Sequence, residues 1–447
     1  MRAPQKGWVT ESAPRAEKWY YSFLPNGMAG GVTQPAIPLY ATQALGGTVA
    51  DAGIITAAAS LTSVPAFLFW GSASDAMKRR RLFVLIGFVG MALSLAFMAV
   101  AVTLREYYLA NLLVGALAAA SAPVGPVLIA ETSREEEWPA RLATFNRIGG
   151  FGWVAGLGIG ALWMSVESAG VGMGVALQGL FVLGAALALL SAFLAWRWMP
   201  EPAVTIDRRA ITIPHLTLWF AEKARYVPQR VLHYFDPRHL LGESKLPRDL
   251  RVYLGSAFLL FAGFSAFYAI FPIFLVQVTG ISVAQVFAIY LVGHLVSALS
   301  YPFMGRWVAR RGGRHAQLVA SSARVVLIPA VFLLSLLPIG VAGAFVAILV
   351  LHAGIGICWA AINTSGATIV SHLSRAEARA EAMGAYNAMQ GFGAVFGPVA
   401  VGYAATWLGF GAGFVAAALL VAGGVVVLAR LRFATETPAD AAITSAS

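Results

Sequence analysis

Long apolar blocks are the feature that most restricts how this chain of 447 residues can fold. A hydrocarbon core of about 30 Å needs a helix of about 20 mostly apolar residues, and twelve blocks of about that length are present. They occupy 19–43, 49–74, 82–104, 107–130, 142–166, 168–196, 252–279, 282–305, 315–337, 341–371, 382–406 and 408–429. We therefore predict an all-α integral membrane protein with twelve transmembrane helices in two groups of six.

The composition of the chain supports this assignment. Apolar residues make up 59% of the sequence and charged residues only 11%, whereas soluble domains carry about 25% charged residues. The first apolar block is too long for a cleavable signal peptide, whose apolar core spans about 7 to 15 residues, so it is counted as a helix. The single cysteine, Cys358, excludes an intramolecular disulfide.

The basic residues predict the orientation of the helices. When the N-terminus is placed inside, all but Arg105 of the 31 Lys and Arg residues fall in inside segments or on the inner half of a helix. Because inside loops are enriched in Lys and Arg, we expect a multi-pass protein of the cytoplasmic membrane with both termini cytoplasmic. The net charge of +11 then matches an anionic inner leaflet. No nucleic-acid partner is expected, since the basic residues are spread over all inside segments.

A repeated motif relates the two groups of helices. FNRIGGFGWVAG at 145–156 is matched by YNAMQGFGAVFG at 386–397, and the same offset of 241 positions matches Gly115 with Gly356. A second offset, of 234 positions, aligns the starts of the groups: it matches Gln34 with Tyr268 and Pro38 with Pro272. The two six-helix bundles are therefore predicted to be repeats of one another.

The repeats set the domain boundaries. We assign a cytoplasmic N-terminal tail to 1–18, the first bundle to 19–199, a cytoplasmic basic linker to 200–249, the second bundle to 250–432 and a cytoplasmic C-terminal tail to 433–447. Within the linker, IPHLTLWFAEKARYV mixes apolar and basic residues. Such a segment fits a helix lying on the membrane surface or an unstructured connection.

Two parallel six-helix repeats resemble the architecture of the major facilitator superfamily, and the resemblance covers 18–432. The family's pattern between helices two and three is Gly, three residues, Asp, a basic residue, one residue, Gly and two basic residues. GSASDAMKRR matches at Gly71, Asp75, Arg79 and Arg80, but Ala76 replaces the basic residue that follows Asp, and Lys78 replaces the second glycine. The equivalent GRWVARRGGR matches at Gly305, Arg310, Gly312 and Arg314 but has Ala309 in place of Asp.

The resemblance implies a charge network at the inner face that takes part in gating. In the family, the Glu that closes helix four joins this network, and Glu131 occupies its place here. An unpaired carboxylate at the lipid boundary is costly, so pairing could bias the opening of the protein. Ordinary solvated charge at the inner face is the alternative. The predicted gating residues are Gly71, Asp75, Arg79, Arg80, Glu131, Gly305, Arg310 and Arg314.

Small residues recur every four positions on helices five and eleven. They are Gly152, Gly156 and Gly160 on helix five, and Gly393 and Gly397, followed by Pro398, on helix eleven. Small residues on one helix face allow close packing in lipid. The resemblance implies that these helices contact the opposite half, so their smooth faces could allow rocking; static packing is the alternative. Leu157 stands where the family's exporter-type signature has a proline.

Polar residues at mid-depth are candidate substrate contacts, because polar groups persist in hydrocarbon only when they are paired or face a cavity. The candidates are Gln34, Tyr268, His294, His352, Trp359, Asn363 and Gln390. A histidine suits proton exchange near neutral pH, with a hydrogen-bonded structural role as the alternative. No Asp or Glu lies mid-span on helices one, four, seven or ten. Few fixed charges at mid-depth favour a neutral or amphipathic substrate over a multiply charged one.

The predicted function is secondary transport of a small organic solute by alternating access. Proton-linked efflux of a drug or metabolite competes with uptake or facilitated passage of a metabolite, and a non-transporting sensor on the same scaffold is a third alternative. The chain has no His-Glu-x-x-His pair and no Gly-Lys-Ser/Thr loop, the motifs of a zinc enzyme and of an ATP-driven pump. No enzymatic activity, cofactor or metal is expected, and the chain is expected to act as a monomer in the bilayer.

Overall fold

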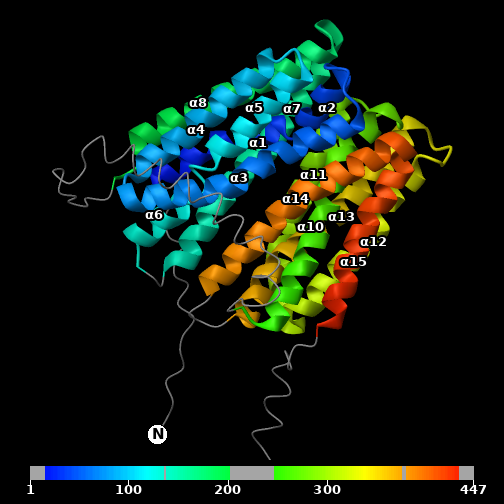
Figure 1. The fold of residues 1–447 in the computed structure, drawn as a ribbon. Helices are drawn as coiled ribbons and strands as arrows, with labels where there is room; N and C mark the ends of the chain where they lie inside the picture. Colours follow the sequence, from blue (N-terminus) through cyan, green and yellow to red (C-terminus); the bar gives the residue numbers. More distant parts are fainter. Residues whose placement is uncertain (1–15, 135–136, 202–245, 375–378, 432–447) are drawn as a thin grey trace, which may run out of the picture.

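The computed structural model describes residues 16–134, 137–201, 246–374 and 379–431, and these residues form helices and no strand. The first half contains η1 Lys18–Phe23, α1 Leu24–Thr33, α2 Ala36–Gln43, α3 Val49–Met77, α4 Arg80–Val100, α5 Leu104–Ala118, α6 Val124–Thr132, α7 Trp138–Gly170 and α8 Met173–Trp198. The second half contains α10 Arg248–Gln277, α11 Val283–Arg311, α12 Gly313–Leu334, α13 Gly340–Leu373, α14 Arg379–Leu408 and α15 Phe410–Arg430. The predicted all-α membrane fold is confirmed (Figure 1).

Ten of the described helices are long and apolar enough to cross a membrane. The other two predicted spans are interrupted: 19–43 consists of η1, α1 and α2, and 107–130 consists of α5 and α6. Pro35 directly precedes α2 and Pro123 directly precedes α6. Because proline has no N–H and its ring clashes with the preceding turn, each break is expected at these positions. In the second half, by contrast, α10 continues through Pro272.

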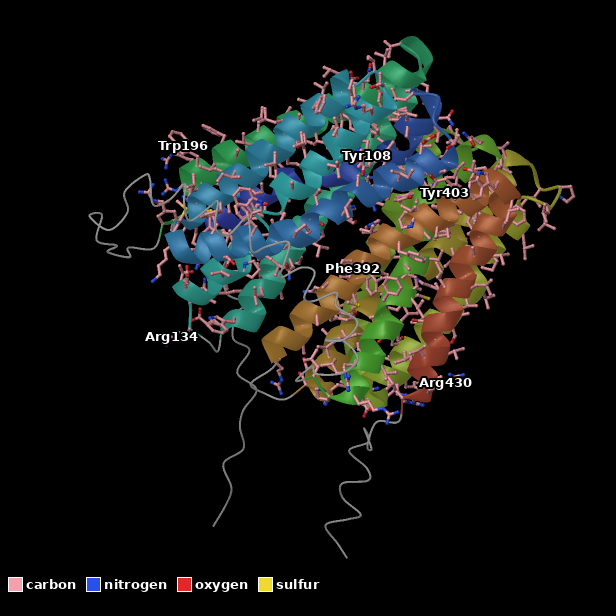
Figure 2. All side chains as sticks on the ribbon, viewed as in Figure 1. Tyr108, Arg134, Trp196, Phe392, Tyr403 and Arg430 are labelled. Atoms are coloured by element: carbon pink, nitrogen blue, oxygen red, sulfur yellow. The ribbon has the colours of Figure 1, made fainter. Side chains whose placement is uncertain are left out.

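The two halves converge at one end and diverge at the other (Figure 1). We call the end that carries Arg80, Arg134, Arg314 and Arg430 the basic end, and the opposite end, with the turns at 44–48, 101–103 and 278–282, the far end. Figure 2 shows Arg134 of the first half and Arg430 of the second at the lower, basic end. The halves meet through α3 against α14 and α7 against α11.

The buried apolar core shows where the halves are joined. One continuous cluster extends over both halves and includes Leu39 and Tyr107 from the first half and Phe271 and Phe287 from the second. Near the basic end the cluster is replaced by two separate ones, around Phe83 in the first half and around Tyr253 and Tyr386 in the second. The halves therefore share a core in the middle and toward the far end, and have separate cores at the basic end.

The outer surface of the bundles is apolar. Several large apolar side chains are each more than 60% exposed, among them Leu93, Leu162, Val326 and Leu419. In a soluble protein, removing such a side chain from water would stabilise the folded state by about 1.5 to 3 kcal/mol. Exposed apolar residues on long apolar helices are the surface that lipid covers.

Several predicted boundaries fall outside the described residues. Most of the linker at 200–249, including its amphipathic stretch, lies outside them, as do nearly all of the two tails. The described part begins each half close to the predicted position: η1 starts at Lys18 and α10 starts at Arg248.

Candidate functional site

A cavity of about 310 Å³ lies between the halves near the middle of the helices. Gln34, at the break between α1 and α2, and Thr56 of α3 line it from the first half. The second half contributes Phe261, Phe264, Ser265, Tyr268, Gly293, His294, Ser297, Gly356, Trp359 and Ala394. Four of the predicted substrate contacts, Gln34, Tyr268, His294 and Trp359, therefore meet in one central cavity, although they come from four different helical segments.

Trp153 of α7 connects the two sides of this cavity. Its indole N–H donates a hydrogen bond to Gln34 Oε1, at 3.1 Å, and its ring stacks on His294 with centroids 6.4 Å apart and planes inclined by 23°. His294 Nδ1 lies 2.9 Å from the carbonyl oxygen of Tyr290. Since a carbonyl only accepts hydrogen bonds, this contact places a proton on Nδ1.

Sequence reasoning missed Trp153, although a signal was present. Trp153 lies inside the first copy of the repeated motif, and the corresponding residue of the second copy is Ala394. Ala394 also lines the central cavity. The repeats thus place a large ring on one side and a methyl group on the other at equivalent positions, and this asymmetry within a matched motif could have marked the site.

A wider cavity of about 660 Å³ lies on the basic-end side of the central one. The two cavities share Phe261 and Ala394. On α3, Thr56 lines the central cavity. The residues of α3 that line the wider cavity lie closer to the basic end: Ser63, Val64, Phe67 and Leu68. Gln390 lines this wider cavity rather than the central one, together with Asn387 and Phe392 of α14, and Figure 2 marks Phe392 at the boundary between the bundles.

Two predicted substrate contacts do not line either cavity. His352 is 1% exposed and stacks flat on Phe271, with ring centroids 5.0 Å apart and planes inclined by 6°. His352 packs behind two residues that line the cavity: its ring is 5.9 Å from that of Tyr268, and its side chain lies against Gly293. Asn363 donates a hydrogen bond to Tyr301 Oη at 2.9 Å and so joins α13 to α11. His352 and Asn363 therefore line neither cavity and instead contact residues of neighbouring helices.

Arg324, which the sequence analysis counted among the basic residues of the inside segments and inner helix halves, lies beside the central cavity. It lies near the middle of α12, is 1% exposed, and donates a hydrogen bond from Nη2 to the carbonyl oxygen of Ile355 at 3.0 Å. Its guanidinium carbon is 4.4 Å from the ring centroid of Phe264 and 5.5 Å from that of Trp359. Both rings line the central cavity. Sequence reasoning had placed the arginines of the helices nearer the inner face, because the depth of α12 relative to its neighbours is a tertiary property.

At the basic end, Arg80 and Glu131 form an ion pair between the start of α4 and the end of α6. Arg80 Nη2 lies 2.6 Å from Glu131 Oε1, and Arg80 Nε donates to Glu131 Oε2 at 3.1 Å. The remaining Nη1 donates to Ser74 Oγ of α3 at 2.7 Å. Arg80 is only 5% exposed. Three helices of the first half are therefore held together by one guanidinium.

A family model described as the Major Facilitator Superfamily matches this chain over 20–364 and 321–446. The chain belongs to the major facilitator superfamily. One similar solved structure is the D323A mutant of the nucleoside transporter NupG, with a TM-score of 0.67 and 17% sequence identity; the match covers 92% of this chain and 97% of that chain. NupG itself has a TM-score of 0.61 and 15% identity, over 92% of this chain and 96% of that chain. The human organic anion transporter MFSD10 (TETRAN) has a TM-score of 0.57 and 15% identity, over 92% of this chain and 98% of that chain. A search of curated proteins found no match.

The superfamily motif explains two unusual backbone positions. Lys78, where the family pattern has its second glycine, ends α3 with φ of 50°, and among the described residues it is the one non-glycine with positive φ. Gly312 occupies the equivalent position at the end of α11, with φ of 81°. The chain therefore turns between the two helices through a residue with positive φ in both repeats: Lys78 is in the left-handed α conformation, whereas Gly312 combines positive φ with an extended ψ of 150°. Glycine adopts both conformations without the steric cost of a Cβ.

The two copies of the superfamily motif differ in charge. At the offset of 241, Glu131 corresponds to His372, which is exposed at the end of α13. Arg314 donates a hydrogen bond to the carbonyl oxygen of Ala429 at 2.8 Å, and Arg310 is exposed.

The other predicted gating residues have few described contacts. A methyl group added at Gly71 or Gly305 would meet nothing within 4 Å. Arg79 begins α4 without a side-chain cap, and the side chain of Asp75 lies outside the described part of the structure.

The glycines predicted for helices five and eleven lie on α7 and α14, and most of them pack against a helix of their own half. Gly152 and Gly156 of α7 lie against Leu24, Gly27 and Met28 of α1. In the second half, Gly393 and Gly397 of α14 lie against Phe258 and Ala262 of α10.

The halves touch through other positions of the same helices. Gly160 faces Phe287 of α11, and the carbonyl of Pro398 lies against Gly53 of α3. Gly152, Gly156, Gly393 and Gly397 therefore pack within their own halves, whereas Gly160 and Pro398 belong to the contact between the halves.

Proposed function

We propose that this superfamily transporter carries a small organic solute across the cytoplasmic membrane by alternating access between its two halves, 19–199 and 250–432. In this proposal the basic end and both termini face the cytoplasm, and the solute binds in the central cavity. The closing residues at the basic end include Arg80 and Glu131. The halves move relative to each other about contacts formed by α3 with α14 and by α7 with α11.

One observation carries the proposal. The central cavity, which both halves line, adjoins a wider cavity on the basic-end side, and the halves have separate cores there. Toward the far end the halves share one core, and Thr406 of α14 accepts a hydrogen bond from the backbone N–H of Ala50 of α3 at 2.8 Å. A site accessible from one end and sealed at the other is what alternating access requires of one of its two states.

Proton coupling is the finer part of the proposal. His294 lines the central cavity, whereas His352 is buried behind Tyr268. A proton carrier must exchange protons with water and sense the solute, so His294 fits the role better than His352. The similar solved structures are a nucleoside transporter and an organic anion transporter, and both classes of solute are organic.

Locking the far end tests alternating access directly. Because Cys358 is the only cysteine, Cys358→Ser gives a background free of thiols, into which Ala50→Cys and Thr406→Cys are introduced together. Cross-linking this pair with an oxidant or a short bifunctional maleimide should hold the basic-end-open state and stop solute flux in proteoliposomes, and reduction should restore flux after oxidation. Each single cysteine variant is the control. Undiminished flux through the cross-linked protein would refute the proposal.

Labelling from one side tests the orientation. Val102 lies in a far-end turn and is 73% exposed, and Lys78 lies exposed in a basic-end turn. In the thiol-free background, an impermeant maleimide added to intact cells should label Val102→Cys and spare Lys78→Cys until the membrane is opened. The reverse pattern would place the termini outside.

A further inference from the structure

The central cavity has basic surroundings that no acidic side chain balances. The sequence contains no Asp or Glu between Asp249 and Glu377, a stretch that includes α10 from its third residue onward and all of α11 to α13. The same stretch contributes His294 to the cavity wall and places Arg324 behind it. Among the described residues no carboxylate forms an ion pair with Arg324.

A guanidinium at this depth is costly to bury. Ionisable groups inside a membrane protein normally pair or line a functional pathway, and Arg stays protonated under all ordinary conditions. Arg324 recovers part of the cost through the hydrogen bond to Ile355 and the ring faces of Phe264 and Trp359. Its Nε has no hydrogen-bond partner in the described structure. The positive charge is therefore solvated by rings and dipoles and lacks a counter-charge.

The positive charge lies one side-chain layer from the cavity. Phe264, Trp359 and Tyr268 all line the central cavity, and all three are neighbours of Arg324. In a medium of low dielectric constant, a charge acts over such distances far more strongly than in water. An anion in the cavity would be attracted by Arg324, and a cation would be repelled.

The cavity also offers hydrogen-bond donors to a solute. Ser297 lies one turn from His294 on α11, is 5% exposed, and its hydroxyl has no hydrogen-bond partner in the described structure. Gln34 accepts the indole N–H of Trp153 through Oε1, which leaves its NH₂ group as a donor. Two neutral donors and a buried positive charge suit a carboxylate, whose oxygens only accept hydrogen bonds when ionised.

We infer that the central cavity selects solutes that carry a single negative charge on an aromatic or otherwise apolar body, with Arg324 as the specificity-determining charge. One buried guanidinium balances one carboxylate. The rings of Phe261, Phe264, Tyr268 and Trp359 cover an apolar body. This inference rests on the proposed function, because it assigns the solute class of the same cavity.

Matched ligands of one skeleton test the inference without requiring transport. The purified full-length protein is heated in detergent with phenylacetate, phenylacetamide or phenethylammonium, and with the corresponding indole set, indole-3-acetate, indole-3-acetamide and tryptammonium. Ligands that bind the folded state raise the apparent Tm. We expect the carboxylates to raise Tm more than the amides, and the ammonium compounds to have no effect. Equal shifts for the three members of a set, larger shifts for the amide or ammonium members, or no shift with any carboxylate would overturn the inference.

Substitutions connect the effect to Arg324. Arg324→Met should weaken carboxylate binding on the order of 10-fold or more and leave amide binding within about 2-fold, whereas Arg324→Lys should retain the preference for carboxylates in part. If Arg324→Met fails to fold, two variants of the cavity wall test the inference: Tyr268→Phe, next to the guanidinium, and Ser297→Ala, which removes a hydroxyl donor. Each should weaken carboxylate binding more than amide binding. A purely structural Arg324 would lower stability and change both ligands equally.

Flux measurements separate this inference from the proposed function. If carboxylates stabilise the protein selectively but no solute crosses a proteoliposome membrane, the transport proposal fails and the solute class stands. If neutral or cationic solutes cross and carboxylates neither bind nor cross, transport stands and the solute class is wrong.

Discussion

Trp153 of the first half and His294 of the second half stack with ring centroids 6.4 Å apart. Trp153 also donates its indole N–H to Gln34. The two halves of the transporter therefore touch within the central cavity itself, through residues that line it or support its lining. Any relative rotation of the halves must change this contact, so it is a direct connection between solute binding and the arrangement of the halves.

Replacing Trp153 should separate the two parts of its role. Trp153→Phe retains a ring for stacking but loses the hydrogen bond to Gln34, which is worth about 0.5 to 1.5 kcal/mol, so we expect solute binding to weaken about 2- to 10-fold. Trp153→Ala removes both interactions and should weaken binding more. Binding is measured by ligand-dependent Tm shifts, with Trp163, which donates to a carbonyl within the first half, replaced by Phe as the control. Equal effects of the two Trp153 variants would show that the hydrogen bond dominates.

Breaking the Arg80–Glu131 pair should destabilise the basic end of the first half. Glu131→Gln removes the charge that faces a nearly buried guanidinium, and because the Glu131 side chain is 35% exposed we expect a cost of about 1 to 2 kcal/mol, below the range for fully buried pairs. The apparent Tm in detergent and the transport rate are the measurements. Arg197→Gln, at an exposed arginine in the last turn of α8 that is outside the predicted gating set, is the control. A changed Tm with an unchanged transport rate would assign the pair to stability and remove it from gating.

The left-handed turn between α3 and α4 offers a stabilising substitution. Lys78 has φ of 50°, a conformation that costs a residue with a Cβ about 1 to 2 kcal/mol. Lys78→Gly should therefore raise the stability of the protein by about 1 kcal/mol, after the loss of some backbone entropy in the unfolded chain. Gly312→Ala, at the equivalent turn, should lower it by about 1 to 3 kcal/mol, because φ of 81° with ψ of 150° is a conformation essentially restricted to glycine. Thermal unfolding of both variants, with Lys78→Ala as the control that keeps the Cβ, checks the sign.

The glycines that pack within each half should tolerate no side chain. A methyl group added at Gly156 would lie 2.8 Å from the Met28 Cα, and one added at Gly397 would lie 2.9 Å from the Ala262 Cα. These contacts are backbone atoms that a rotamer change does not relieve, so Gly156→Ala and Gly397→Ala should each cost about 1 to 3 kcal/mol or more. Gly71→Ala and Gly305→Ala, where the added group meets nothing within 4 Å, should unfold at or slightly above the wild-type temperature, because alanine favours a helix interior over glycine. A Tm loss at the second pair that matched the first would contradict the packing argument.

Replacing each mid-depth histidine should reveal the proton carrier. If the proposed coupling runs through His294, His294→Gln should make solute flux in proteoliposomes insensitive to an imposed pH gradient, because no cavity-lining imidazole remains to exchange a proton. His352→Gln should keep the response, since that ring does not line the cavity. Internal pH is followed with a trapped dye during flux. Gradient-driven flux that persists in His294→Gln would end the histidine proposal.

The sequence by itself determined the helices and their relationship. Twelve apolar blocks predicted twelve crossings, because each helix that spans hydrocarbon must satisfy its own backbone, and this physical demand acts on each segment separately. The repeated motif predicted two related halves. The equivalent positions Lys78 and Gly312 of the superfamily motif both have positive φ. Gln34, Tyr268, His294 and Trp359 could be chosen as cavity candidates, because polar or aromatic residues in a long apolar block need a partner or a cavity.

The tertiary structure decided which of those candidates meet. His352 and Asn363 satisfy the same sequence criterion but lie outside the cavities, and Trp153 and Arg324 contribute although sequence reasoning left them out. The direction and depth of a side chain depend on the rotation and tilt of its helix, which are set by packing against neighbouring helices far apart in the sequence. For the same reason, only the assembled halves show that the site is sealed toward the far end and accessible toward the basic end.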